Sequence, residues 1–309
     1  MIKNPLYFCA PILVLSLALT ACSDSSYVAP LPSDAKTLTV SVTDAPLDGV
    51  SKVIVQFSGI EIKHVDAEAQ IIVFDTPVDV DLLGLPGSQR STILLEEKIP
   101  KGDYEYLRLI VNAAQGEFDS IVILDDNTWQ SLYVPDNEKI GLKILQPFSI
   151  NSGRNTHLTV DFDLRKSVEK DVAEAEYQLA PSLRIVSDRE AGHVKGLVSN
   201  TLLTDNACVD VNSQTNAAVY LFSAFSDGEV PQDIQRNEFD PVSSANIEFD
   251  TQTGEYYYEL GFLPRDVSYS AVVVCDASID TPSAVDALIF IGETKGVTPI
   301  ETLSIELNF

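Results

Sequence analysis

Residues 37–43 read Thr-Leu-Thr-Val-Ser-Val-Thr, an unbroken alternation of apolar and hydroxyl side chains. Successive side chains of a β-strand point to opposite faces, so Leu38, Val40 and Val42 are predicted on a buried face and the hydroxyl residues on a face turned to water. Residues 53–62 repeat the alternation, and Ser58-Gly59 in their middle predicts a β-bulge. The start of the folded chain is therefore predicted to be β-structure.

The same period of two recurs along the chain, interrupted by turn signals such as Pro86-Gly87. Further strands are predicted at 71–74, 92–95, 104–111, 121–124, 128–134, 141–150, 157–164, 182–186, 192–198, 217–222, 245–249, 255–260, 269–275, 287–291 and 303–309. Only residues 167–177 suggest a helix, and a loop fits them equally well. The second half is predicted to lack helices. This pattern predicts an all-β fold, a sandwich or a barrel, in two domains.

The first 21 residues have the features of a signal peptide. Lys3 supplies a positive charge, and residues 10–19 form an apolar run too short to span a bilayer comfortably. The run ends in Leu19-Thr20-Ala21-Cys22, which resembles the lipobox of bacterial lipoproteins; an ordinary secretory signal with a chance cysteine is the alternative. The resemblance implies acylation of Cys22 and, because Ser23 follows it, the outer membrane of a Gram-negative bacterium. We therefore expect residues 1–21 to be removed, a lipidated tether at 22–36 and domains at 37–188 and 192–309.

The composition narrows the choice of partners. The 309 residues include 20 Lys+Arg and 46 Asp+Glu, for a formal net charge of −26, and 45% of them are hydrophobic. That apolar fraction suits a folded protein, and the charge disfavours a nucleic-acid partner because phosphate backbones would be repelled. The expected partners are the membrane, through the N-terminal lipid, and a glycan or an envelope protein.

Two cysteines remain in the predicted mature body, Cys208 and Cys275. An even pair in an exported protein is a candidate disulfide, and two separate buried thiols are the alternative.

Several segments resemble known families. The stretch Ser41-Val42-Thr43-Asp44-Ala45-Pro46, residues 53–62, Pro100-Lys101-Gly102-Asp103-Tyr104 with Arg108, residues 158–163, and Leu183-Arg184 resemble domain-of-unknown-function family 4382 over about residues 37–188. That resemblance implies an exported β-domain of undetermined role. Residues 192–198 and 250–263 resemble the transthyretin-like, carboxypeptidase-regulatory-like β-sandwich. Together with the lipobox, the resemblances imply two β-sandwich domains, immunoglobulin-like or transthyretin-like, behind a lipoprotein signal peptide. Neither resemblance supplies a catalytic residue.

Acidic side chains offer two candidate sites. Asp44, before Ala45-Pro46, is either a strand terminator or a ligand-binding residue. His157, Asp161 and Asp163 share the polar face of one strand, which we expect to be solvated, with a calcium site as the alternative. Calcium needs six to eight oxygen ligands, so a loop would have to supply the others.

Aromatic residues allow a binding interpretation. Trp129 and Tyr257 lie in predicted strands at positions from which a ring could face outward as a sugar-stacking platform. Packing in the core or at its rim is the simpler interpretation, since strands favour aromatic residues.

No catalytic motif stands out. The chain has three histidines and contains neither a Gly-x-Ser-x-Gly elbow nor a His-Glu-x-x-His helix. We therefore expect a lipid-anchored, non-catalytic binding module of the cell envelope, with a glycan or protein ligand and calcium as a candidate cofactor. A structural spacer or assembly component is the second hypothesis, and a hydrolase is the third.

Overall fold

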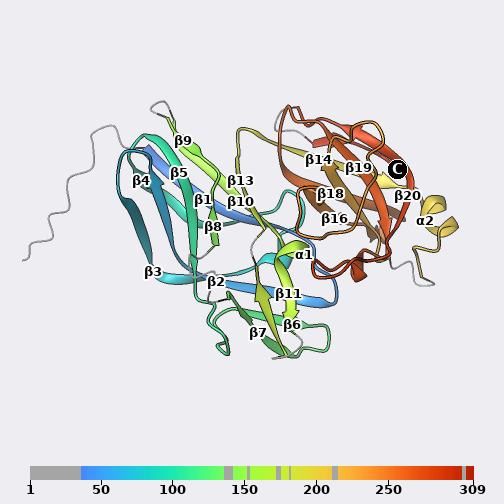
Figure 1. Ribbon diagram of the computed structural model, residues 1–309, viewed down its shortest axis with the longest axis horizontal. Coiled ribbons are helices and arrows are strands. Elements are labelled where there is room, and N and C mark those ends of the chain that lie inside the picture. Colours follow the sequence, from blue (N-terminus) through green and yellow to red (C-terminus); the bar gives the residue numbers. More distant parts are fainter. Residues whose placement is uncertain are drawn as a thin grey trace, which may run out of the picture. The chain divides into compact units, whose positions relative to one another are not determined.

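The computed structural model describes residues 36–135, 142–151, 154–171, 175–180, 182–210, 215–300 and 304–309. All of them belong to one compact unit, and they are mostly β, as the alternation predicts (Figure 1). They form two β-sandwiches, the N-terminal sandwich over residues 36–187 and the C-terminal sandwich over residues 191–309. Among the described helices, none is long and apolar enough to cross a membrane.

The N-terminal sandwich has one sheet of four strands and a second sheet of nine. The first sheet has the order β13-β10-β1-β4, with β1 at Lys36–Ala45, β4 at Ser91–Ile99, β10 at Thr156–Asp163 and β13 at Leu183–Ser187. The second sheet contains β2 at Val50–His64, β3 at Ala69–Asp81, β5 at Gly102–Val111, β6 at Ile121–Leu124, β7 at Trp129–Tyr133, β8 at Leu142–Ile144, β9 at Phe148–Ile150, β11 at Val168–Asp171 and β12 at Glu176–Leu179.

The alternating residues of β1 and β2 explain how these sheets pack. Leu38, Val40 and Val42 are fully buried in the core with Val53 and Phe57 of β2. Burying side chains of this size stabilises the fold by about 1.5–3 kcal/mol each.

The predicted bulge at Ser58-Gly59 is confirmed. The register of β2 shifts between Phe57 and Gly59 against both β3 and β5. A Cβ on Gly59 would lie 2.6 Å from the carbonyl oxygen of Ile72, so a side chain at this position would push the two strands apart.

The C-terminal sandwich has two sheets of four strands, with the orders β17-β18-β14-β21 and β16-β15-β19-β20. Its strands are β14 at Ala191–Val198, β15 at Ala218–Ser223, β16 at Ser243–Asn246, β17 at Glu248–Asp250, β18 at Glu255–Pro264, β19 at Tyr269–Cys275, β20 at Ile289–Val297 and β21 at Ser304–Glu306. The core between them contains Val194, Leu221, Tyr258 and Val273. A smaller cluster around Tyr220 covers the other face of β15 and β19.

Two predictions about helices are wrong. The described residues of 167–177 form neither the suggested helix nor a loop: α1 spans only Leu164–Ser167, and β11 and β12 pair as antiparallel strands on either side of residues 172–174, which lie outside the described part. The C-terminal sandwich was expected to lack helices, yet α2 spans Asn200–Asp205 between β14 and β15.

Residues 141–150, expected to be one strand, contain two strands, β8 and β9, with Pro147 between them.

Two short 3-10 turns complete the described elements, η1 at Leu82–Gly84 and η3 at Ala277–Ile279. Between the sandwiches, β13 ends at Ser187 and β14 begins at Ala191. The domain boundaries proposed from the sequence remain predictions.

Candidate functional site

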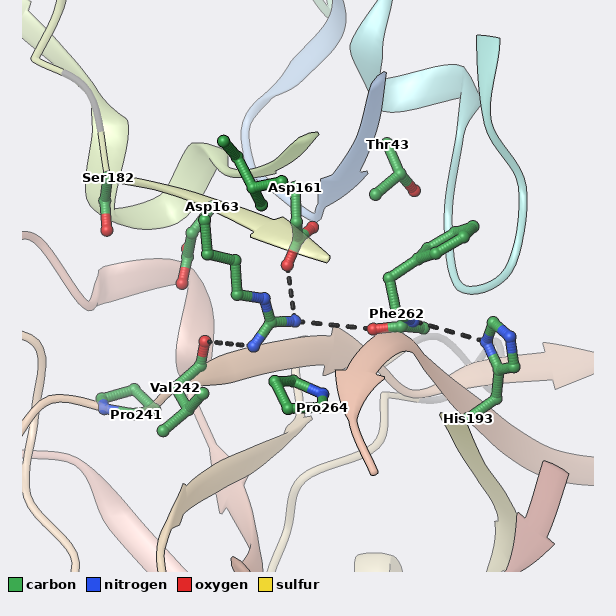
Figure 2. Close-up of polar contacts among 12 residues, drawn as sticks. Thr43, Asp161, Asp163, Ser182, His193, Pro241, Val242, Phe262 and Pro264 are labelled. Carbon is green, nitrogen blue, oxygen red and sulfur yellow. Dashed lines mark hydrogen bonds and ion pairs between the residues drawn. The ribbon is translucent and has the colours of Figure 1, made fainter. Parts of the chain in front are cut away.

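A layer of buried ion pairs lies where the polar face of the first sheet meets the C-terminal sandwich. Asp161 of β10 and Arg184 of β13 are cross-strand neighbours, and their side chains pair at 2.5 Å. Arg184 also donates to the backbone oxygen of Val242 at 3.3 Å and to that of Gly261 at 3.5 Å. Figure 2 shows Asp161 and Asp163 of this layer together with Pro241 and Val242 from the C-terminal sandwich. Burial raises the pKa of Asp161, although the Arg184 guanidinium opposes this effect.

The next pair begins α1. Asp163 accepts a hydrogen bond from the backbone N–H of Lys166 at 3.2 Å and pairs with its Nζ at 2.7 Å, so it caps the helix and neutralises a nearly buried lysine. The same Nζ donates to the carbonyl oxygen of Pro241 at 2.7 Å.

Arg165 is the most buried cation of this layer, with 2% of the residue exposed. It pairs with Asp48 at 2.7 Å, donates to the Asn246 side chain at 2.8 Å and reaches the carbonyl oxygen of Ala277. Burial lowers its pKa, but neighbouring groups including Tyr220 and Asp48 outweigh that effect and raise it. The guanidinium is therefore a fixed positive charge.

A cavity of about 540 Å³ opens beside this layer, lined by Lys166, Arg184 and Arg236. Each of these cations already pairs with a carboxylate, Arg236 with Glu169 at 3.1 Å. Because all three cations are already paired with carboxylates, none of them is available to a ligand. The arrangement is therefore suited to holding the two sandwiches together.

The predicted solvent exposure of the polar face is wrong. Thr43 and Thr159 are 1% and 0% exposed, and Asp161 and Asp163 are 6% and 5% exposed. The C-terminal sandwich covers this region: β16 contacts β1, and β18 contacts β13. The hydroxyls of Thr43 and Thr159 have partners: Thr43 donates to the carbonyl oxygen of Gln89 at 2.6 Å and Thr159 to the carboxylate of Asp188 at 2.7 Å.

The calcium hypothesis for His157, Asp161 and Asp163 gains no support from their placement. Both carboxylates are paired with cations, and His157 is exposed near the start of β10, away from them. The three side chains do not converge on one position.

Asp44 and Tyr257, two residues singled out as ligand candidates, line the same cavity of about 420 Å³. Asp44 lies near the end of β1 and is buried, whereas Tyr257 lies on β18 with 40% of the residue exposed. Tyr256 and Tyr258 point to the opposite face of β18 and are 3% and 1% exposed. Tyr258 also belongs to the lining of the cavity, but Tyr257 is the only one of the three tyrosines that is exposed.

This cavity, which we call the acidic cavity, is lined by four carboxylates and by no Lys, Arg or His among the described residues. The carboxylates are those of Asp44, Asp161, Glu248 and Glu259. Tyr257 donates to Glu248 Oε2 at 2.5 Å, and this bond together with burial raises the pKa of Tyr257 to about 12. The hydroxyl group of Tyr257 is therefore held in place, while the residue remains partly exposed.

Trp129, which the sequence also indicates as a ligand-binding candidate beside Asp44 and Tyr257, lies outside this cavity. It is at the start of β7 in the nine-stranded sheet, with 59% of the residue exposed, and it does not line the acidic cavity.

An acidic cluster that the sequence reasoning missed lies in the C-terminal sandwich. Oxygens of Asp233, Asp280 and Asp286 come within 4.8 Å of one another. Asp280 accepts from Tyr220 at 2.6 Å and from the backbone N–H of Ile234 at 3.1 Å, while burial raises its pKa to about 6. Through Asp280, these two bonds connect the segment around Ile234 to Tyr220 of β15. This is a structural role. The only sequence signal was three aspartates spread over 54 residues.

Cys208 and Cys275 form a disulfide, with their Cα atoms 5.3 Å apart. It ties the segment after α2 to the end of β19, and both cysteines are buried. The lipidation candidate, Cys22, lies outside the described residues.

Comparison with known families bears on the N-terminal sandwich. The family model described as Domain of unknown function (DUF4382) matches residues 35–181, which runs from β1 through β12. The chain therefore carries a DUF4382 domain, and the predicted family is confirmed for this part; no family model identifies the C-terminal sandwich. No curated protein and no solved structure matches the chain.

Proposed function

We propose that this protein is an exported lipoprotein that binds a neutral glycan in the acidic cavity without turning it over. Acyl chains on Cys22 would anchor it in the envelope of a Gram-negative bacterium, at the outer membrane. The observation that supports binding is the meeting of Asp44 and Tyr257, which are far apart in the sequence, in one cavity.

The lining of the acidic cavity fits a hydroxyl-rich, uncharged ligand. Carboxylates accept hydrogen bonds from sugar hydroxyls, and the exposed face of Tyr257 offers a surface on which the C–H face of a sugar ring can pack. Asp161 is paired with Arg184, but the other carboxylates of the lining, with no cation in the lining beside them, would repel an anionic ligand. Calcium can assist such a contact by bridging carboxylates and sugar hydroxyls.

The C-terminal sandwich also supports a binding role. Its two four-stranded sheets agree with the transthyretin-like, carboxypeptidase-regulatory-like module that its sequence resembles. We propose that assignment for residues 192–309, as a non-catalytic module that contributes Tyr257 and both glutamates of the acidic cavity.

Substitution of Tyr257 tests the proposal. Tyr257→Ala should reduce retention in gels that contain a neutral glucan, galactomannan or xylan by about tenfold, because the stacking surface is lost. Repeating the measurement with calcium and with EDTA tests whether calcium takes part. The variant should fold normally, since Tyr257 is partly exposed.

Trp129→Ala is the matched control, because Trp129 is an exposed aromatic residue on a strand outside the cavity. Its retention should equal that of the unchanged protein. The proposal fails if no neutral glycan retards the protein, or if Trp129→Ala loses retention while Tyr257→Ala keeps it.

Anchoring is tested separately at Cys22. Cys22→Ser should move the protein from the membrane to the soluble fraction and remove incorporation of labelled fatty acid, because the thiol that carries the lipid is absent. Unchanged fractionation would reject the lipoprotein assignment and leave glycan binding to be judged on its own test.

A structural spacer is the second candidate function. It is favoured by the bonds that tie the sandwiches into one unit, such as those of Arg165 with Asp48, Asn246 and Ala277. A spacer predicts a protein partner in cross-linking and no change in melting temperature with any glycan.

A further inference from the structure

A second cavity, of about 460 Å³, lies at the other end of the first sheet. It is formed where the chain enters β10 and leaves β13, and Pro264 at the end of β18 completes it. Arg154, Arg189 and His157 line it, and Glu190 is the one carboxylate in its lining. We call it the basic cavity; it shares no lining residue with the acidic cavity.

The two arginines of the basic cavity differ from all the others in the chain. The sequence has eight arginines among 46 acidic residues. Six of them pair with a carboxylate: Arg90, Arg108, Arg165, Arg184, Arg236 and Arg265. Among the described residues, Arg154 and Arg189 have no such partner, and both line this one cavity.

Two acids flank Arg189 in the chain, Asp188 and Glu190, and the first of them is already engaged. Asp188, beside Arg189, pairs with Arg90 and accepts from Thr159 at 2.7 Å. Its backbone N–H donates to the carbonyl oxygen of His157 at 3.1 Å, which fixes the turn after β13. The carboxylate of Asp188 therefore already has Arg90 and Thr159 as partners.

The wall of the basic cavity is held by specific bonds. The Gln146 amide both donates to and accepts from the backbone of Ile185, at 2.7 and 3.1 Å, and thereby joins the β8–β9 connection to β13. Phe148 stacks on Tyr104 with ring centroids 5.0 Å apart. Asn151, Asn155 and Ser149 add neutral polar groups to the lining.

We propose that the basic cavity binds an oxyanion, a carboxylate or phosphate group on a small polar ligand, through Arg154 and Arg189. Guanidinium groups match the geometry of both oxyanions and make charge-assisted hydrogen bonds with them. The net charge of −26 repels anions at a distance, but salt screens that repulsion beyond about 8–10 Å, so two unpaired arginines decide the local attraction. His157, which also lines the cavity, can donate a hydrogen bond from its imidazole ring.

Isothermal titration of the full chain in a non-ionic detergent tests this site. The probes are inorganic phosphate and sodium glucuronate at an ionic strength of about 0.15 M, where the repulsion by the net charge is screened, with methyl glucoside as the neutral comparison. The chain should bind at least one oxyanion and not methyl glucoside. The tighter of phosphate and glucuronate identifies which source of the oxyanion the cavity accepts.

Arg154→Gln and Arg189→Gln should each weaken binding of the oxyanion by about tenfold, because each removes one charge-assisted contact. Lys195→Gln is the matched control: it removes an exposed cation without a carboxylate partner, outside the cavity. It should change the affinity by less than about twofold.

Two results would overturn the proposal. One is the absence of binding for both oxyanions at millimolar concentration; the other is an equal loss in Lys195→Gln and the two arginine variants, which would mean diffuse electrostatic attraction. Because the two cavities share no residue, oxyanion binding can fail while neutral-glycan retention persists, and the reverse.

Discussion

The arginines at the junction of the two sandwiches and those of the basic cavity are in opposite situations. Arg165 and Arg184 are buried or nearly so, and each has a carboxylate and backbone oxygens around its guanidinium. Arg154 and Arg189 are exposed and have no carboxylate partner among the described residues. One chain with a large excess of acid thus pairs most of its arginines and leaves two unpaired at one place.

Desolvation explains the difference. A buried charge costs several kcal/mol unless a partner and hydrogen bonds compensate it, so the arginines of the junction require their acids for folding. An exposed arginine keeps its water and costs the fold little without a partner. A charged side chain without a partner is therefore compatible with a stable fold only at the surface, where a ligand can also reach it.

The largest effect on stability is expected when a buried cation loses its carboxylate partner. Asp48→Ala removes the carboxylate of Arg165 and should lower the free energy of unfolding by about 3–5 kcal/mol, because the guanidinium stays buried without its acid. Calorimetric unfolding measures this as a lower melting temperature. Asp48→Asn, which keeps a hydrogen-bonding oxygen but loses the charge, should lose less; an unchanged melting temperature in Asp48→Ala would mean that the ion pair contributes little.

An intermediate effect is expected at Asp280, a buried acid bonded mainly to neutral donors. Its pKa in the folded protein is about 6, above the ordinary 3.8, so between about pH 4 and 6 the folded state binds more protons than the unfolded state. This group therefore makes the protein less stable as the pH rises through that window, by about 2 kcal/mol.

Asp280→Asn removes this titration while it keeps an acceptor for Tyr220 or Ile234. The stability of the variant relative to the unchanged protein should rise from pH 4 to pH 7, measured by urea unfolding at several pH values. Parallel stability curves for the two proteins would contradict the raised pKa.

The smallest effect on stability is expected in the basic cavity. Arg189→Gln should change the free energy of unfolding by less than about 0.5 kcal/mol, because the side chain is exposed and pairs with no acid. Urea unfolding is the measurement. A loss above about 1 kcal/mol would place Arg189 with the structural arginines of the junction and remove the contrast between the two groups.

Much of the β-structure could be predicted because it is local. The alternation in residues 37–43 predicted a strand with Leu38, Val40 and Val42 on its core face, and all three are buried. The same pattern gave the wrong environment for Thr43 and Asp161, since polar side chains on a strand do not reveal that a second sandwich will cover them. Ion pairing with Arg184 is what makes burial of Asp161 tolerable.

Helices were harder to predict, for a physical reason. Residues 167–177 mix charged and helix-favouring side chains, yet their described parts pair as β11 and β12 and extend the nine-stranded sheet through β7. Tertiary pairing outweighed local preference there. The single turn of α1 depends on the Asp163 cap, which is too short a signal to separate from a strand end.

The sequence by itself determined the class of fold and which faces of the early strands enter the core, because side-chain alternation and glycine at a bulge act over neighbouring residues. Only the tertiary structure decided which charged side chains form ion pairs between the sandwiches and which remain available to a ligand. It brought Asp44 and Tyr257 into one cavity and Arg154 and Arg189 into another. The physical reason is that the pairing of distant strands, and the desolvation of each charged side chain by the elements packed over it, are properties of the whole fold.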